Sequence, residues 1–450
     1  MNSNISGKKI LIIGGGTPSS DLITLAHRNN VKVGVTDYFE KEYTKDVADF
    51  AHNVSTIDVD AVVDLVKKEH YDGIITQFVD SLLPYVARQA EKLDMFSPFT
   101  EEQAKMSTDK GYFKRTCQQY DVPVPKEYNI AALNDIDQTD IDFPVIIKPR
   151  DGSGSRGITV CYSKEDLKTG FEKAVDKSKS GSVIVEQFLP YDEINLTYII
   201  QDGDVQLAAI HDRYFNTQQT GVIKIPDLYI YPSRYTDMFL EKYNDKVVNM
   251  LKGIGLKNGS LFIQAIVKED EVYLYEAGMR LNGCKTYQIL EVENDYNTYE
   301  HLMNYALTGS MGRHTDFDPK FKRWYATWCV VSKPGMVIDR FEGKEELQSY
   351  PWLIHIAQRY QPGDKIPEDS KGTLAQLTAR IHIYADTKEQ LYERLEKTFK
   401  LFNPVDSEGN SVLMQPHSID DLKKSLDYCE MLFSISSMTY QIQDSIPILF

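Results

Sequence analysis

Strands and helices alternate along the first hundred residues, and this order constrains the fold more than any other feature of the sequence. Short apolar runs at 8–13, 31–35 and 73–76 predict strands. Apolar residues at helical spacing over 58–68 and 82–93 predict the helices between and after them. Parallel strands need such crossover helices, so this segment is predicted to form a doubly wound parallel sheet of the α/β class.

A glycine turn after the first predicted strand imitates a dinucleotide-binding site. Gly14–Gly16 ends the apolar run, and Asp37 follows the second strand. The G-x-G-x-x-G pattern is incomplete because Ser19 stands where its last glycine belongs. NAD binding is therefore kept only as a minor alternative.

The chain becomes rich in β-strands after a helical stretch over 100–120, which the prolines at 123 and 125 bring to an end. Strands are predicted at 143–148, 157–162, 182–188, 193–201, 205–210, 261–267 and 272–276, with a helix at 236–253. In the last third, 379–385 alternates apolar and polar residues, and Thr387 with Gln390 forms a capping box that opens a helix. The length of 450 residues suggests about three domains.

Composition excludes several classes of protein. A formal net charge of −16 and the lack of a Lys/Arg cluster argue against a nucleic-acid partner. Five cysteines without a C-x-x-C pair argue against a disulfide framework and a zinc site, and favour a reducing compartment. The apolar run at 10–13 is too short for a signal peptide or a membrane span. We expect a soluble, cytoplasmic protein with no membrane partner.

A glycine- and serine-rich loop between two predicted strands is the first candidate site. Lys148 ends the first of these strands and can place a positive charge on phosphate. The loop can lay its backbone N–H groups against phosphate oxygens, since few Cβ atoms block the approach. Its candidate residues are Gly152, Ser153, Gly154, Ser155 and Gly157. A plain flexible turn is the alternative, because no Walker A lysine follows the loop.

Two carboxylates follow the loop in the sequence. Glu186 interrupts the apolar strand 183–189, and Glu193 comes seven residues later at the start of another strand. Such carboxylates suit the donors of an adenine amino group and a ribose hydroxyl. Solvated glutamates at a strand edge are the alternative.

Oxygen ligands then appear on two strands of a predicted hairpin. Gln264 lies on the first strand and Glu276 on the second, with Arg280 four residues further on. In an extended chain Glu276, Gly278, Arg280 and Asn282 point the same way. Amide and carboxylate oxygens suit magnesium, and the arginine can stabilise a transferring phosphoryl group. A surface Glu–Arg pair is the alternative.

The ordered set of these residues resembles the ATP-grasp superfamily, in the branch that contains biotin carboxylase, carbamoyl phosphate synthetase and the L-amino acid ligases. The resemblance spans essentially the whole chain and adds Lys110, which lies in a helical region ahead of the prolines. It implies a pre-ATP-grasp domain at 1–100, an ATP-grasp domain at 101–312 with a flap at about 122–190, and a biotin-carboxylase-like C-terminal domain at 313–450.

The resemblance also implies a role for each candidate residue. Lys110 and Lys148 contact the ATP phosphates under the closing Gly/Ser loop. Glu186 receives adenine with the neighbouring Gln187 and Leu189, and Glu193 holds the ribose. Gln264, Glu276 and Asn282 ligate magnesium, with Mn²⁺ as an alternative metal. Arg280 stabilises an acyl phosphate.

One position departs from the family pattern. The family usually has Asn two residues after the metal-binding Glu, where this chain has Gly278. The change removes one magnesium ligand and leaves open whether one or two metal ions bind. Asn282 or water is the expected substitute.

The expected activity is ATP-dependent ligation of a small carboxylate to an amine, or to a thiol, through an acyl phosphate. The alternatives are a bicarbonate-activating, carboxylase-like enzyme and a nucleotide-binding regulatory protein without turnover. Relatives are often dimers, so the resemblance allows a homodimer. Asp80, His211 and Cys284 could lie near the substrate. Helix capping by Asp80 or Ser81 and a buried thiol at Cys284 are favoured instead, and a structural histidine explains His211 equally well.

Overall fold

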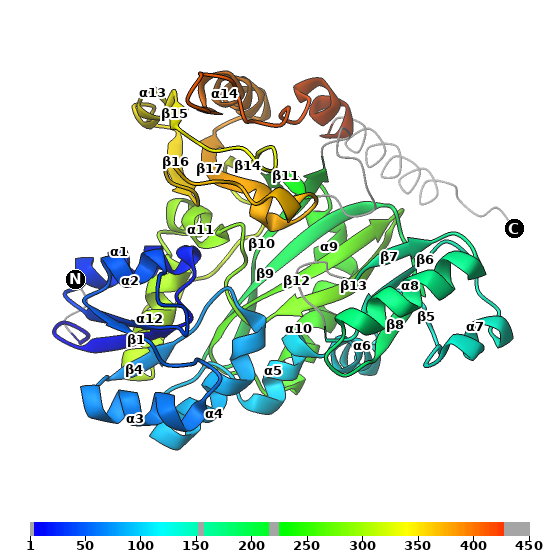
Figure 1. Cartoon of the computed structure of the whole chain (residues 1–450), viewed down its shortest axis with the longest axis horizontal. Helices are drawn as coiled ribbons and strands as arrows, with labels where there is room; N and C mark the ends of the chain where they lie inside the picture. The colour runs from blue at the N-terminus through cyan, green and yellow to red at the C-terminus, as the bar shows by residue number, and fades with distance from the viewer. Residues whose placement is uncertain (1–3, 152–156, 216–224, 427–450) are drawn as a thin grey trace, which may run out of the picture. The chain divides into compact units, whose positions relative to one another are not determined.

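The computed structural model describes residues 4–151, 157–215 and 225–426, which form two compact units (Figure 1). Unit 1 comprises Met1–Ile210 and Met238–Phe321, and unit 2 comprises His211–Asp237 and Lys322–Phe450. The division into domains at 1–100, 101–312 and 313–450 stays a prediction. The candidate loop residues Gly152, Ser153, Gly154 and Ser155 lie outside the described residues.

Unit 1 begins with a four-stranded parallel sheet in the order β3-β2-β1-β4. Its strands are β1 (Lys9–Ile13), β2 (Lys32–Thr36), β3 (Phe50–His52) and β4 (Gly73–Ile75). One face of β1 packs against α1 (Ser20–Arg28) and α12 (Thr298–Thr308), and the other against α3 (Val59–Glu69) and α4 (Leu83–Leu93) (Figure 1). The predicted doubly wound α/β arrangement is therefore confirmed.

A second, antiparallel sheet of unit 1 has the order β5-β8-β6-β7. Its strands are β5 (Glu127–Tyr128), β6 (Val145–Pro149), β7 (Thr159–Cys161) and β8 (Val183–Gln187). The apolar residues of β6 and β8 pack on α8 (Lys164–Lys177) and on Ile136 of α7 (Leu133–Gln138). This packing leaves Lys148 and Glu186 of adjacent strands on the opposite side of the sheet, since neighbouring residues along a strand alternate faces.

The third sheet of unit 1 contains the predicted hairpin. The strands β9 (Asp192–Gln201), β12 (Gly259–Lys268) and β13 (Glu271–Gly278) pair in the antiparallel order β13-β12-β9, and β10 (Asp204–Phe215) follows β9. The helices that accompany this part of the chain are α5 (Glu101–Thr108), α6 (Lys110–Gln119), α9 (Thr236–Lys242), α10 (Asn244–Gly253) and α11 (Thr286–Asn294).

Unit 2 contains the end of β10 and the antiparallel strands that follow it in the order β11-β14-β17-β16. These are β11 (Pro226–Tyr231), β14 (Trp324–Val331), β16 (Leu353–Gln358) and β17 (Leu377–Ala385). The predicted alternation is confirmed, since Ala379, Ile381, Ile383 and Ala385 all face the core. That core is completed by α14 (Lys388–Leu401), which the side chain of Thr387 caps, and by α13 (Lys344–Gln348). Strands β15 (Arg340–Glu342) and β18 (Asn403–Val405) form a separate pair.

Two predicted helical stretches are each divided in the structure. The stretch 100–120 forms α5 and α6, and the carboxylate of Asp109 caps α6 by accepting from the N–H groups of Gly111 and Tyr112 at 2.8 and 3.0 Å. This cap starts a new helix, so the positions of Lys110 and Lys114 are set by α6 and not by α5. The stretch 236–253 forms α9 and α10. Among the described residues, no helix is long and apolar enough to cross a membrane.

Candidate active site

A buried cluster of charges joins α6 to the sheet of β6 and β8. The carboxylate of Glu186 accepts hydrogen bonds from the ammonium groups of Lys148 and Lys114, one on each oxygen. Lys114 also lies 3.4 Å from Glu127. The side chains of all three cluster residues are almost inaccessible to solvent. Two strands and a helix thus hold two ammonium groups around one carboxylate.

The electrostatics of this cluster follow from its burial. Burial lowers the pKa of Lys148, and the nearby Lys114 and Lys110 act in the same direction, while Glu186 opposes them. Burial works against the charged form of Glu186, but Lys148 and Lys114 outweigh it and hold the pKa of this carboxyl below its usual value. The two ammonium groups of the cluster face Glu186 and, at its edge, Glu127, and Lys110 adds a further positive charge nearby, which suits a phosphate-binding site.

The cluster changes the predicted division of roles. The resemblance assigned Lys148 to phosphate and Glu186 to adenine, yet the two side chains bind each other and Lys114. With both oxygens accepting from lysines, Glu186 is better suited to positioning these lysines than to receiving an adenine amino group. Gln187 and Leu189, at the end of β8 and just after it, remain the candidates for backbone contacts with the base.

The chain around the phosphate loop is anchored at both ends. Asp151 accepts hydrogen bonds from Ser178 Oγ and from the Ser180 N–H, both at 2.8 Å. Gly157 has a φ of +76°, and a Cβ there would come within 2.9 Å of Pro149 and of Lys177. Any other residue would be strained at this position, which precedes β7.

Glu193 lies at the start of β9 and is half-buried. Its carboxylate accepts a hydrogen bond of 2.8 Å from the hydroxyl of Tyr275 on β13. The tyrosine fixes one side of the carboxylate, a contact that sequence reasoning did not anticipate. The ribose role of Glu193 stays a prediction.

Three oxygen-bearing side chains form one row across β9, β12 and β13. Asn195 pairs with Gln264, and Gln264 pairs with Glu276. Directly paired residues of antiparallel strands point to the same face, so these side chains are neighbours. Asn195 is almost fully buried, and its Oδ1 accepts no hydrogen bond from the described residues. A buried carbonyl oxygen without a donor suits a cation. The hairpin prediction for Gln264 and Glu276 is consistent with this row, which Asn195 extends.

Arg280 follows the row and is held on three sides. Its guanidinium donates to Asp80 at 2.5 Å and to the carbonyl of Leu281 at 3.0 Å, and it lies 4.8 Å from the centre of the Phe262 ring. Burial raises the pKa of Asp80, Arg280 opposes that rise, and Glu276 adds to it, so these three charges are close together. The capping interpretation of Asp80 is wrong, because the carboxylate pairs with Arg280 and caps neither following helix.

The structure explains why a glycine stands at position 278, which the sequence did not reveal. Gly278 pairs with Phe262 across the hairpin, and a Cβ at this glycine would lie 2.2 Å from a carbon of the Phe262 ring. The ring thus occupies the space of the family's asparagine side chain and at the same time supports Arg280. With the Phe262 ring in this position, a side chain at 278 would collide with it, which accounts for the glycine.

Asn282 reaches the same face by a different route from the predicted one. Strand β13 ends at Gly278, so its alternation does not extend to Asn282 and that part of the prediction is wrong. Instead the Asn282 amide donates to Thr197 Oγ1 at 3.2 Å, and its Oδ1 accepts from the Thr286 N–H at 3.1 Å. Thr197 shares a strand face with Asn195, so Asn282 lies beside the row while serving mainly to hold the loop before α11.

Other candidates from the sequence have structural explanations. Gly15 donates its N–H to Asp37 at 3.0 Å, so this aspartate is bound to the glycine turn itself. His211 is fully buried, with its ring centre 4.4 Å from that of Tyr231. Cys284 is buried 3.5 Å from the hydroxyl of Thr286. The four described cysteines are free thiols.

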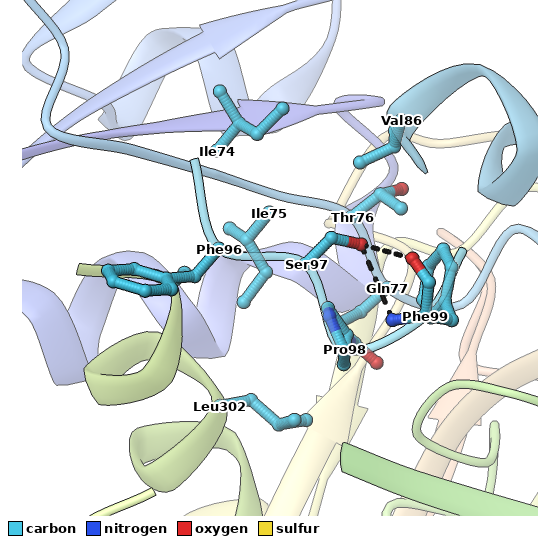
Figure 2. A pocket seen from close by; sticks show the side chains of 11 residues that line it. Ile74, Ile75, Thr76, Gln77, Val86, Phe96, Ser97, Pro98, Phe99 and Leu302 are labelled. Carbon is cyan, nitrogen blue, oxygen red and sulfur yellow. Dashed lines mark hydrogen bonds between the residues drawn. The ribbon is translucent and has the colours of Figure 1, made fainter. Parts of the chain in front are cut away.

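A separate pocket opens at the end of β4 and is mostly apolar. Figure 2 shows Ile75, Phe96 and Leu302 around it, with a Ser97–Phe99 turn along one wall. The polar side chain of Gln77 accepts the Leu281 N–H at 2.7 Å and so holds the segment that carries Arg280. Without a charged lining residue, this pocket does not suit phosphate or carboxylate.

The stretch from β6 into α11, which holds Lys148 and Glu186 of the cluster, the row and Arg280, matches a family model described as an ATP-grasp domain over residues 141–288. Residues 141–288 thus form a domain of the ATP-grasp superfamily. The order of charged residues predicted this family, and the ATP-grasp fold with its N-terminal parallel sheet agrees.

Similar proteins of this superfamily are enzymes. A formate-dependent phosphoribosylglycinamide formyltransferase of Ignicoccus hospitalis is 26% identical over 266 residues, which cover 56% of this chain and 64% of that protein. The L-amino acid ligase of Bacillus licheniformis superimposes with a TM-score of 0.73 at 16% identity, covering 89% of this chain and 99% of that one. The biotin carboxylase domain of the Hydrogenobacter thermophilus 2-oxoglutarate carboxylase, solved with MgADP and bicarbonate, gives 0.73 at 17%, with coverages of 88% and 90%.

The site contains residues that sequence reasoning missed. Lys114, Asn195, Phe262 and Tyr275 belong to it through contacts between separate elements. Asn195 alone had a signal, because its position two residues after Glu193 on one strand face was recognised without being assigned a role. Lys110 begins α6, close enough to Lys148 for its charge to lower the pKa of that lysine.

Proposed function

We propose that this ATP-grasp chain is an ATP-dependent carboxylate–amine ligase that acts through an acyl phosphate. The observation that carries the proposal is the row Asn195–Gln264–Glu276 with Arg280 beside it, held by Asp80 and Phe262. A row of hard oxygen ligands next to a fixed guanidinium suits phosphoryl transfer, which depends on positioning and on neutralising charge.

The first step transfers the γ-phosphoryl group of ATP to a carboxylate. A carboxylate oxygen attacks the γ-phosphorus, the bond to the β,γ-bridging oxygen breaks, and ADP leaves with that electron pair. Lys148, backed by Lys114 and Lys110, balances charge on the phosphates, and Arg280 stabilises the acyl phosphate. Since Glu186 fixes the two buried lysines before ATP arrives, little reorganisation is needed during the reaction.

The second step forms the new bond to nitrogen. A neutral amine attacks the acyl carbon, the carbon–oxygen bond to phosphate breaks, and inorganic phosphate leaves while the nitrogen loses one proton. Arg280 stays beside the leaving phosphate. This step requires that water, which otherwise hydrolyses the acyl phosphate, is kept from the site.

The row of side chains fits magnesium. No group of three or more His, Cys, Asp or Glu suited to a metal occurs among the described residues, so a metal here must rely on amide oxygens as well. Magnesium is commonly held by one or two carboxylates together with substrate phosphates and water. Glu276, Gln264 and Asn195 would hold it, Mn²⁺ being the alternative, and the ion would neutralise phosphate charge. Gly278 favours a single ion at this row.

The proposal is tested by trapping the acyl phosphate. Purified protein is incubated with Mg-ATP, hydroxylamine and a panel of small carboxylates, and both ADP and acyl hydroxamates are measured. We expect ADP and a hydroxamate to appear together with at least one acid. Glu276→Gln should need more magnesium for half-maximal rate, whereas Glu389→Gln, at an exposed position on α14, should not. ADP without any hydroxamate from every acid would overturn the ligase mechanism.

Two other functions are separated by the same assay. The similarity to the carboxylase domain solved with bicarbonate favours bicarbonate as a competing acid, and ADP release that needs bicarbonate but no amine would identify it. A regulatory protein without turnover would bind Mg-ADP and release no ADP with any acid. We further propose a cytoplasmic enzyme with small-molecule substrates, without nucleic-acid or membrane partners, and test a homodimer by light scattering.

A further inference from the structure

The turn that follows β4 has a left-handed backbone at Phe78. Its φ is +69°, a region in which the Cβ of a bulky residue crowds its own backbone. Of the ten residues other than glycine with positive φ in the described part of the chain, only Phe78 and Phe321 are phenylalanines. Phe78 follows a parallel strand at its carboxyl end, the edge at which open α/β sheets bind ligands. Backbone strain kept at such an edge indicates a role in the site.

The strained turn is held by the ring of Phe78. This ring packs edge-to-face on Tyr299 of α12, with 5.8 Å between the ring centres and 80° between the ring planes. Tyr299 is fully buried in the core that β1 shares with α1 and α12, and Phe78 packs against that core. The next residue, Val79, is extended and 37% exposed. The left-handed conformation thus keeps the ring in the core while the following residue turns toward solvent.

The residues on either side of this turn both reach the segment that carries Arg280. Gln77 accepts the N–H of Leu281 at 2.7 Å, and Asp80 accepts from Arg280 Nη2 at 2.5 Å. Gln77 precedes Phe78 and Asp80 follows it, so a rotation about φ of Phe78 moves one acceptor relative to the other. The two acceptors therefore meet consecutive residues only while this angle is fixed.

Asp80 and Arg280 are joined by a single hydrogen bond. Arg280 Nε and Asp80 Oδ1 are both buried, and neither has a hydrogen-bond partner among the described residues. An arginine and a carboxylate often pair through two parallel hydrogen bonds, which fix the plane of the guanidinium. With one such bond, the orientation of Arg280 depends on where the backbone carries Asp80. The Phe262 ring lies 4.8 Å from the guanidinium and supports its face without offering a hydrogen-bond acceptor in its plane.

We propose that Phe78 is a positioning residue for Arg280. Its left-handed backbone, locked by the ring on Tyr299, sets the places of Gln77 and Asp80 and through them the place of the guanidinium. Phe78 acts through these neighbours and needs no contact with a reacting group. The positioning follows from the turn itself, whereas its effect on the rate rests on the proposed function.

The test removes the ring and follows both the position of Arg280 and the rate. Phe78→Gly allows a positive φ without strain, but it has no side chain that would hold the turn there. Crystal structures of the wild-type protein and the variant, both with Mg-ADP, should show the guanidinium displaced by about 1 Å or more, enough to lower kcat by about a hundredfold. The KM for Mg-ATP should change by less than about twofold, because the Lys148 cluster is untouched.

Matched variants separate positioning from a general loss of structure. Phe321→Gly removes the other left-handed phenylalanine and should leave kcat and KM unchanged. In an Arg280→Lys background, Phe78→Gly should cause no further loss of rate, because residues that act through one group are not additive. Binding of Mg-ADP, measured by calorimetry, shows that each variant is folded. If Phe78→Gly does not fold, Phe78→Leu keeps an apolar side chain and should lower kcat in the same direction.

The outcomes distinguish this proposal from the proposed function. If Arg280 keeps its place in the variant, or if it moves without any loss of rate, Phe78 is not a positioning residue. An equal loss from Phe78→Gly in the wild-type and Arg280→Lys backgrounds would also overturn the proposal, because the turn would then act on another group. If the guanidinium moves in the crystals but the wild-type protein yields no acyl hydroxamate with any acid, the positioning stands and the ligase function fails.

Discussion

The lysine–glutamate cluster of unit 1 and Asp227 on β11 of unit 2 bury charge in opposite ways. In the cluster, Glu186 meets Lys148 and Lys114 directly, and all three side chains are enclosed. Asp227 is almost fully buried, neither of its carboxylate oxygens accepts a hydrogen bond from the described residues, and His417 Nδ1 lies 3.4 Å away. Charges that meet directly are held in position by the fold, whereas a buried carboxylate without a hydrogen-bond donor costs stability.

The largest effect is expected for Lys148→Met, which removes the charge that the phosphates meet. ADP formation should fall by about a thousandfold, the upper range for losing one stabilising group of a transition state. The rate is measured at saturating Mg-ATP, and Lys333→Met, at an exposed lysine of unit 2, is the control. A Lys148→Met enzyme with near wild-type rate would place the phosphate site elsewhere.

A direct test of the comparison removes one charge from each region and measures stability. Lys114→Met breaks a buried pair and should lower the free energy of unfolding by about 3 kcal/mol. Asp227→Asn removes a buried charge that lacks a full partner, so it should leave stability unchanged or raise it. Urea unfolding of both variants is compared. Equal destabilisation would mean that Asp227 is paired within the chain and would remove the contrast.

The packing of Gly278 leads to a smaller effect on stability. Gly278→Asn should destabilise the protein by about 1–3 kcal/mol, because the new side chain collides with the Phe262 ring. Phe262→Ala in the same chain should relieve the collision and let the asparagine join the row, lowering the magnesium concentration for half-maximal rate. If Gly278→Asn alone is as stable as wild type, the ring moves freely and does not determine this glycine.

The smallest effect is expected on the free energy of unfolding at acidic pH. The folded pKa of Glu186 lies below its ordinary value of 4.5, so its pairing stabilises the fold fully above that value, and this contribution is lost as the pH falls through the folded pKa. Glu186→Gln should therefore flatten the loss of stability below about pH 4.5. Denaturant midpoints from pH 3 to pH 7 measure it, and an unchanged slope would show that the carboxylate is not paired in solution.

Much of the architecture was predictable because it depends on local order. The doubly wound sheet follows from strands and helices that alternate over short distances, and the core face of β17 follows from residues two apart. The hairpin was also predictable, with Gln264 and Glu276 on its two strands, and the structure adds that these two residues pair directly. The same reasoning failed at Asn282, because the strand ends at Gly278 and alternation ends with it.

By itself, the sequence determined the family, the order of the elements and the main candidate residues, because spacing, turn chemistry and alternation are properties of neighbouring residues. The tertiary structure alone decided which charges meet. Asp80 reaches Arg280 across 200 residues, and Lys114 reaches Glu186 across 72. It also showed that the Phe262 ring lies against Gly278 and that no described residue donates a hydrogen bond to Asp227. Such contacts depend on strand register and side-chain packing between distant segments, which no local pattern specifies.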